Sequence, residues 1–228
     1  MAGARKSSEL QTRILSGIVM AAVALFAAWV GGIVFFLFWL AAAIGIFLEW
    51  WKLTRGSMGW ALPGLIYAAI VLAAPVVLRM DTELGLTAVF WLFAVVWGSD
   101  VMAYFCGRTI GGPKLWPAVS PKKTWSGFIG GTAFAVAAGT GVAVAAGVPT
   151  LLPVALVSLF AAVLSQGGDL FESSLKRRFG VKDSGKLIPG HGGLMDRLDG
   201  FVLAGLFALL IGVGRGGLDA AGRGVLMW

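Results

Sequence analysis

Charged residues are scarce in this chain of 228 residues: Asp, Glu, Lys and Arg together make up 13% of it, whereas hydrophobic residues make up 58%. The mean hydropathy is +0.89. This composition excludes an ordinary soluble globular domain. Several apolar runs also reach the ~20 residues that a helix needs to cross ~30 Å of hydrocarbon. Because a helix satisfies its own backbone polar groups, the sequence predicts an all-α, polytopic membrane protein.

Cysteine and histidine are rarer still, and Cys106 and His191 are the only residues of their kinds in the sequence. A lone cysteine excludes an internal disulfide, and one residue of each type cannot supply a zinc site of the usual ligand spacing. The net charge of +7 favours anionic partners. Since no basic, aromatic-rich module stands apart from the apolar runs, we expect no nucleic acid partner and consider anionic lipid and phosphate instead.

The apolar runs predict about seven transmembrane spans. The first two are separated at Gly31-Gly32, because a continuous run of 37 residues would be too long for one crossing. Basic residues precede the first run, as in a signal peptide, but further spans follow at once, so we expect the first span to be retained. The predicted spans are residues 14–30, 31–50, 60–78, 84–106, 126–147, 150–167 and 199–215.

The basic residues divide unequally between the two ends of these spans. With a cytoplasmic N-terminus, only Arg79, Arg215 and Arg223 fall on the outer side, and the other Lys and Arg residues fall on the inner side. This bias follows the positive-inside rule. We therefore expect a multi-pass protein of the cell's inner membrane, with its active site facing the cytoplasm. The expected division is N-terminal spans in residues 1–90 and a catalytic region in residues 91–228, with cytoplasmic polar loops at 107–125 and 168–198.

A first polar cluster ends the fourth span and consists of Ser99, Asp100, Tyr104 and Arg108. An acid near hydrocarbon is costly and therefore indicates a functional role, and Asp100 shares a helix face with Tyr104. A structural ion pair between Asp100 and Arg108 at the membrane interface is the alternative.

A second cluster lies in the loop 107–125 and contains Ser120, Lys122 and Lys123. Two prolines stiffen this loop before the adjacent lysines, which can hold a nucleotide's phosphates as point charges. Lysines and tryptophans at a membrane interface are also common as anchors, and this cluster alone favours the anchor interpretation.

A third cluster is a polar stripe that continues the sixth span. Steps of 4, 3, 1 and 3 residues place its members within roughly a 100° arc of one helix. Carboxylate, hydroxyl and ammonium groups on one face can bind a metal ion and a phosphate together. The stripe consists of Ser165, Asp169, Glu172, Ser173 and Lys176.

A charged, glycine-rich segment follows the stripe, with Asp196 and Asp199 three residues apart at the start of the last span. With Asp169, these acids can form an oxygen-ligand site for Mg²⁺. A structural network with the neighbouring arginines is the alternative. The glycines can let backbone N–H groups approach phosphate oxygens, and the lone histidine can stabilise a turn or donate to phosphate. Polar and glycine candidates in this segment are Arg177, Lys182, Lys186, His191, Gly192, Gly193 and Arg197.

The segment from Ser173 to Asp199 resembles the signature of the phosphatidate cytidylyltransferase (CDP-diacylglycerol synthase) family. The resemblance covers about residues 95–200 and departs from the family at Ser126, where an acid is common. Two further blocks resemble the same family: Ser99-Asp100 with Ala103-Tyr104 and Gly107-Arg108, and Ser120-Pro121-Lys122-Lys123-Thr124-Trp125 with Gly127. The signature residues are Ser173, Lys176-Arg177, Lys182-Asp183, Gly185, Ile188-Pro189-Gly190-His191-Gly192-Gly193, Asp196-Arg197 and Asp199.

The resemblance implies a nucleotidyltransferase that transfers CMP from CTP to phosphatidate, giving CDP-diacylglycerol and pyrophosphate. It also implies Mg²⁺, with K⁺ as a candidate second cation, and it suggests a homodimer. We expect a catalytic set of Asp169, Lys176, Asp196 and Asp199, and metal ligands from Asp169, Asp196 and Asp100. The expected substrate-binding residues are Ser99, Asp100, Tyr104, Arg108, Ser120, Lys122, Lys123, Ser165, Glu172, Ser173, Arg177, Lys182, Lys186, His191, Gly192, Gly193 and Arg197.

Three other functions are compatible with parts of this pattern. The acceptor can be another lipid phosphate, such as an archaeol-type or polyprenol-type one, because headgroup motifs would be similar. A cation-coupled transporter would need polar groups spread through the depth of the bilayer, whereas here they gather at one rim. A scaffold without catalysis leaves the cost of the buried carboxylates unexplained.

Overall fold

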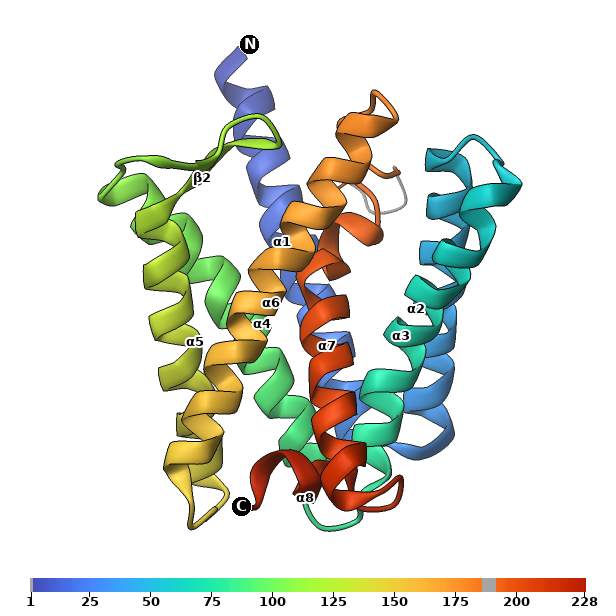
Figure 1. Cartoon of the computed structure of the whole chain (residues 1–228). Helices are drawn as coiled ribbons and strands as arrows, with labels where there is room; N and C mark the ends of the chain where they lie inside the picture. The colour runs from blue at the N-terminus through green and yellow to red at the C-terminus, as the bar shows by residue number, and fades with distance from the viewer. Residues whose placement is uncertain (1, 186–191) are drawn as a thin grey trace.

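The computed structural model describes the backbone of residues 2–185 and 192–228, and side chains from residue 15 onward. It is a bundle of long helices with one small antiparallel hairpin (Figure 1). The helices are α1 (Ala2–Val30), α2 (Gly32–Leu53), the 3₁₀ turn η1 (Met58–Trp60), α3 (Ala61–Met80), α4 (Gly85–Thr109), α5 (Trp125–Ala145), α6 (Leu151–Arg178), α7 (Met195–Gly216) and α8 (Ala221–Leu226). The strands are β1 (Lys114–Trp116) and β2 (Ser120–Thr124).

Within the described residues, 6 helical segments are long and apolar enough to cross a membrane, and they correspond to α2 through α7. The polytopic helical fold is therefore confirmed. The first predicted span lies in α1, whose described apolar part, Leu15–Val30, is shorter than the other candidates. The total of seven spans stays a prediction.

The polar connections gather at one end of the bundle. The start of α1, the turn between α2 and α3, the hairpin and the end of α6 lie at this end, while α8 lies at the other (Figure 1). At the α8 end, Arg79 Nε donates to the Ala28 carbonyl (2.8 Å) and Arg215 Nη1 donates to the Gly224 carbonyl (2.6 Å). Arg79 and Arg215 therefore lie at the same end of the bundle, and the assignment of either end to a side of the membrane stays a prediction.

The hairpin is a departure from the all-α expectation. Lys114 pairs with Thr124 and Trp116 pairs with Ser120 across β1 and β2. These strands are hard to predict from the sequence, because they are short and because Pro121 within β2 argues against a strand. The predicted loop 168–198 is also helical at both ends, since α6 continues to Arg178 and α7 begins at Met195.

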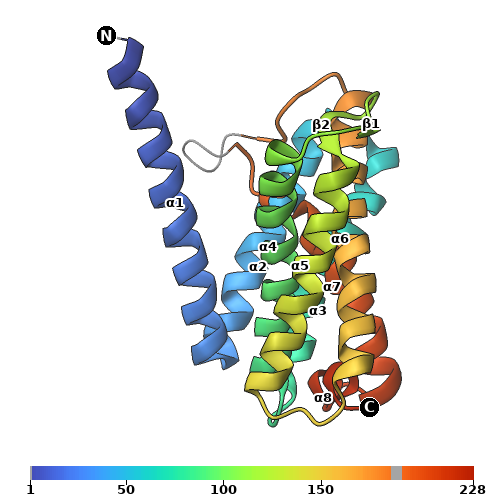
Figure 2. The ribbon, with the colours of Figure 1, turned by 90° about the vertical axis from the view of Figure 1, so that its left-hand side faces the viewer.

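The core lies where α2, α4 and α7 meet. The indole of Trp39 in α2 stacks on the ring of Phe201 in α7, with centroids 4.8 Å apart. Phe93 and Trp97 in α4 stack at the same centroid distance, 4.8 Å. The helix α1 stands apart from this core towards its N-terminal end (Figure 2). This arrangement leaves one side of α2, α4 and α7 facing α1.

The carboxylate of Asp81 ties α8 to the turn between α3 and α4. Its Oδ2 accepts from the backbone N–H of Arg223 (2.7 Å), and its Oδ1 accepts from the N–H of Glu83 (2.9 Å). Burial alone would raise the pKa of Asp81, but these N–H groups and the Arg223 guanidinium outweigh it and hold the pKa below its usual range. The carboxylate therefore stays charged and hydrogen-bonded at neutral pH.

Candidate active site

A lysine joins the polar stripe of α6 to the start of α7. Lys176 Nζ lies 2.7 Å from Glu172 Oε2 and 2.7 Å from Asp196 Oδ1. Glu172 is one helical turn before Lys176 and its side chain is 0% exposed. Because a buried carboxylate needs a counter-charge, Lys176 keeps Glu172 paired while it holds Asp196 against α6. The predicted helical stripe thus faces α7.

Asp196 also organises the backbone that precedes α7. Its Oδ2 accepts hydrogen bonds from the N–H of Gly193 (2.9 Å) and the N–H of Ser184 (3.1 Å). The first N–H groups of a helix have no intrahelical partner, so an acid in the first turn is favourable there. One carboxylate therefore fixes α6, the residues after it and the start of α7 relative to one another.

The hairpin reaches the same site through Lys123. Its Nζ lies 2.5 Å from Asp169 Oδ2, and Ser173 Oγ donates to Asp169 Oδ1 (3.4 Å). Two predicted groups are thus brought together from β2 and α6, which are distant in sequence. Lys123 therefore pairs with the carboxylate that the sequence predicts as a metal ligand.

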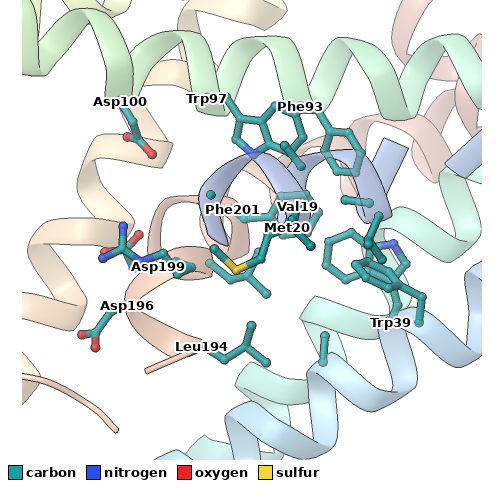
Figure 3. Close-up of a pocket in the computed structure, with 18 of the residues that line it drawn as sticks. Val19, Met20, Trp39, Phe93, Trp97, Asp100, Leu194, Asp196, Asp199 and Phe201 are labelled. Carbon is teal, nitrogen blue, oxygen red and sulfur yellow. The ribbon is translucent and has the colours of Figure 1, made fainter. Parts of the chain in front are cut away.

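A partly open cavity of about 760 Å³ lies between α1, α2, α4 and α7. Its carboxylates, Asp100, Asp196 and Asp199, lie on one side (Figure 3), and Arg197 also lines the cavity. Its other side is apolar and aromatic, with α1 contributing Met20 (Figure 3). The cavity therefore runs from a charged end to an apolar wall. The apolar residues labelled there are Val19, Met20, Trp39, Phe93, Trp97, Leu194 and Phe201.

The acids of the site come from three helices: Asp100 from α4, Asp169 from α6, and Asp196 and Asp199 from α7. Among the described residues, no three Asp, Glu, His or Cys side chains stand close enough to enclose a metal ion by themselves. Mg²⁺ rarely requires such a cage, because it is usually bound by one or two carboxylates, waters and substrate phosphates.

Buried hydroxyl groups lie in helices next to these acids. Ser99 in α4 and Ser165 in α6 are both 0% exposed, and their hydroxyls lack a hydrogen-bond partner within the part of the chain that the structure describes. The hydroxyl of Tyr67 in α3, a residue that is 7% exposed, likewise has no partner among the described residues. Nothing in the sequence distinguished Tyr67 from an ordinary core aromatic residue.

Two predicted residues are exposed near the end of α4. Tyr104 is 58% exposed, and Arg108 Nη1 donates to its hydroxyl (2.6 Å). Arg108 thus binds Tyr104, and the alternative ion pair with Asp100 does not occur among the described side chains. Ser126 Oγ, at the position where the sequence departs from the family, donates to the Gly111 carbonyl.

The structure describes some of the remaining predicted residues without showing a role for them. Ser120 belongs to β2, and Gly192 has a φ of +85°. Lys186 and His191 lie outside the described residues. Lys122, Arg177 and Lys182 are exposed. Their roles stay predictions.

Glu49 is a residue of the site that the sequence analysis did not single out. It lies in α2 and is 5% exposed, yet it contacts residues at the start of α7: the N–H of Leu194 (3.0 Å) and the N–H of Met195 (2.8 Å) donate to its two oxygens. A signal was present, because Glu49 is the only acid in the predicted span 31–50. The argument applied to Asp100, that an acid in an apolar span indicates a role, applies equally to it.

A comparison with known protein families shows to which family the chain belongs. The model of the cytidylyltransferase family matches residues 56–213. The chain belongs to the cytidylyltransferase family. This family membership makes the chain a nucleotidyltransferase, and it confirms the resemblance carried by the signature between α6 and α7.

Curated relatives extend over most of the chain. A protein of Brucella abortus named phosphatidate cytidylyltransferase is 40% identical, over 90% of this chain and 94% of the relative. Proteins of the same name from Rickettsia prowazekii and Rickettsia bellii are 33% and 35% identical, over 88% and 87% of this chain and 90% and 89% of the relatives. The similarity therefore extends over most of the helices and is not confined to the charged segment between α6 and α7.

Proposed function

We propose that this chain is a phosphatidate cytidylyltransferase, which transfers CMP from CTP to phosphatidate. The observation that carries the proposal is the cavity, which joins Asp100, Asp196 and Asp199 at one end to an apolar wall at the other. An anionic lipid has the same division into a charged head and apolar chains. The names of the cytidylyltransferase relatives support the same conclusion.

In this reaction an oxygen of the lipid phosphate attacks the α-phosphorus of CTP. A new P–O bond forms, the bond from the α-phosphorus to the oxygen bridging the β-phosphorus breaks, and pyrophosphate leaves with the bonding electron pair. The attacking phosphate is already ionised at neutral pH, so no strong base is needed. Positioning and neutralisation of charge supply the catalysis.

Basic side chains around the site suit this demand. Lys123 and Lys176 reach the acids from β2 and α6, and Arg197 lines the cavity. An ammonium that contacts a carboxylate in the free protein can exchange it for a phosphate oxygen when the nucleotide binds. We assign these three residues to the phosphates of CTP and of the lipid.

The donor set also fits Mg²⁺. We assign Asp169 and Asp100 as its protein ligands: Asp100 lines the cavity, and Asp169 has, among the described residues, a single ammonium, that of Lys123, and one serine hydroxyl to exchange for the ion. The oxygens of Asp196 accept from Lys176, Ser184 and Gly193, so Asp196 would have to release a donor to join them. When bound, the ion would neutralise charge on the triphosphate.

The surroundings of the site follow from its two substrates. We propose that the polar end faces the cytoplasm, where CTP is dissolved, and that phosphatidate enters from the inner membrane through the apolar part of the cavity. K⁺ as a second cation and a homodimer are carried over from the family resemblance. Mass measurement in detergent would test the dimer, and activity in buffers with and without K⁺ would test the cation.

The decisive experiment supplies the purified chain with α-labelled CTP, phosphatidate and Mg²⁺. We expect labelled CDP-diacylglycerol and an equal amount of pyrophosphate, both dependent on phosphatidate and Mg²⁺. Parallel reactions with archaeol-type and polyprenol-type phosphates test the choice of acceptor. Turnover with one of these but not with phosphatidate would contradict the proposal, as would liposome cation flux without any nucleotide transfer.

A further inference from the structure

Glu49 is a charged group in an apolar span whose environment compensates for its burial. It lies one turn from the end of α2 and is 5% exposed. A buried carboxylate without partners would cost several kcal/mol. Glu49 instead accepts from the N–H of Leu194 (3.0 Å), the N–H of Met195 (2.8 Å) and the hydroxyl of Ser184 (3.3 Å).

These donors lie at the start of the catalytic helix. Leu194 is the N-cap of α7 and Met195 is its first residue. Their N–H groups lack intrahelical acceptors, and the helix dipole favours a negative charge at this end. Glu49 thus caps α7 from a helix about 145 positions earlier in the chain.

Glu49 and Asp196 hold the same backbone from two sides. Ser184 gives its hydroxyl to Glu49 and its N–H to Asp196. Asp196 in turn contacts Lys176 on α6. A chain of direct contacts therefore runs from α2 through the start of α7 to the polar stripe.

The glycines of the signature allow this close approach. A Cβ added to Gly185 would lie 2.5 Å from Glu49 Oε1. One added to Gly193 would overlap the Ser184 hydroxyl first and would also lie 2.6 Å from Glu49 Oε2. A side chain at either position would therefore displace the Glu49 carboxylate or the serine that donates to it.

We infer that Glu49 is a positioning residue for nucleotidyl transfer: by capping α7 it fixes Asp196 and Asp199 relative to α6. The inference rests on the proposed function, because the reaction is what this geometry serves. Glu49 itself faces backbone N–H groups and a serine hydroxyl, so it acts through the residues that it holds.

The test compares purified full-length Glu49→Gln with wild type. Glutamine keeps the size of the side chain but loses the charge and one acceptor oxygen, and we expect kcat to fall about 10- to 100-fold, as small misplacements of reacting groups do. We expect KM for phosphatidate to change much less, and the elution profile in detergent to match wild type. A capping role confined to stability would lower Tm and leave kcat per folded molecule intact, and that outcome would overturn the inference.

Matched variants make the result specific. Glu83→Gln removes an acid at the other end of the bundle that is paired with Arg223, and it should retain wild-type kcat. Ser184→Ala removes one of the three donors to Glu49 and should lower kcat by a smaller factor. If Glu49→Gln does not fold, an unchanged kcat in folded Ser184→Ala would overturn the inference instead.

Failure of the proposed function is recognised separately. If wild type does not transfer CMP to phosphatidate, the function is wrong, whatever the variants do. Hydrogen–deuterium exchange then still tests the cap, because the Leu194 and Met195 amides should exchange faster in Glu49→Gln than in wild type. Equal exchange rates would show that Glu49 does not hold α7.

Discussion

At the scale of single residues, the site depends on carboxylates that already have partners. Asp169 pairs with Lys123, and Asp196 with Lys176 and two backbone N–H groups. Such partners offset the cost of burying a carboxylate. The same partners can be exchanged for the phosphates of a substrate, so the free site is preassembled for anionic ligands.

Asp169→Asn tests this arrangement directly. The substitution keeps the shape of the side chain but removes its negative charge. That charge attracts Lys123, and we assign the carboxylate that carries it as a ligand of the metal ion. We expect kcat for CMP transfer to fall by at least about 100-fold, the order lost when one transition-state contact is removed. The measurement is turnover of labelled CTP by protein whose elution profile matches wild type.

Asp219→Asn is the matched control, because Asp219 is exposed and lies between α7 and α8, away from the charged end. It should leave kcat unchanged. Full activity in purified Asp169→Asn would remove Asp169 from the metal and phosphate site.

The sequence predicted these acids because charge in an apolar chain is costly and therefore informative. It also predicted that Asp169 and Lys176 share a helix face, since helical spacing is a local property. It did not predict which acid meets which cation, because the Lys123–Asp169 and Lys176–Asp196 contacts join segments distant along the chain. Glu49 was missed although its signal matched that of Asp100.

At the scale of elements, the site depends on the close approach of α6 and α7. The backbone of α6 at Gly168 lies directly against the Asp199 carbonyl, and a Cβ at this position would overlap that oxygen. Small residues allow helices to pack this closely in membranes. The distance between the stripe of α6 and the acids of α7 is therefore set by a residue that bears no functional group.

Gly168→Ala should push these helices apart. We expect a cost of about 1–3 kcal/mol from overpacking, measured as a lower Tm in detergent, together with a reduced kcat because Asp199 is displaced from α6. Gly141→Ala is the control: a Cβ at Gly141 in α5 meets nothing within 4 Å. That change should be neutral or stabilise by up to about 1 kcal/mol, from helix propensity. Equal behaviour of the two variants would contradict the packing argument.

The helices were predicted well where a long apolar run or a helical spacing of polar residues marked them. Long apolar runs gave α2 to α7, and the polar stripe was correctly expected to continue as helix beyond the sixth span. The hairpin was not predicted, because its pairing depends on residues 114–124 meeting across a turn rather than on an apolar period. The hairpin matters for the candidate site because β2 places Lys123 against Asp169 of α6.

At the scale of the whole molecule, α1 closes a cavity that the other helices leave open on one side. Its residues Val19 and Met20 face the aromatic side chains of α2, α4 and α7 (Figure 3). A lipid held there would have its head near the acids and its chains against α1. The predicted division at residue 90 therefore cuts through the proposed lipid site.

Met20→Trp should narrow this cavity. We expect KM for long-chain phosphatidate to rise by about tenfold, equivalent to about 1.4 kcal/mol of binding free energy, while KM for CTP stays near its wild-type value. Ile18→Trp is the control, because Ile18 is 61% exposed and does not line the cavity. Kinetics with phosphatidates of several chain lengths would measure the effect, and identical KM values for the two variants would argue against a lipid site beside α1.

The contact between Glu49 and the first turn of α7 limits how far this enzyme can be shortened from its N-terminal end. A truncated protein beginning at residue 91 would retain every acid of the signature, yet the amides of Leu194 and Met195 would lose their acceptor and the cavity would lose two of its four walls. Even a truncation at the start of the family match, residue 56, would remove α1 and α2. The smallest transplantable unit is thus nearly the entire polypeptide, and chimaeras should exchange α1 and α2 together with α7.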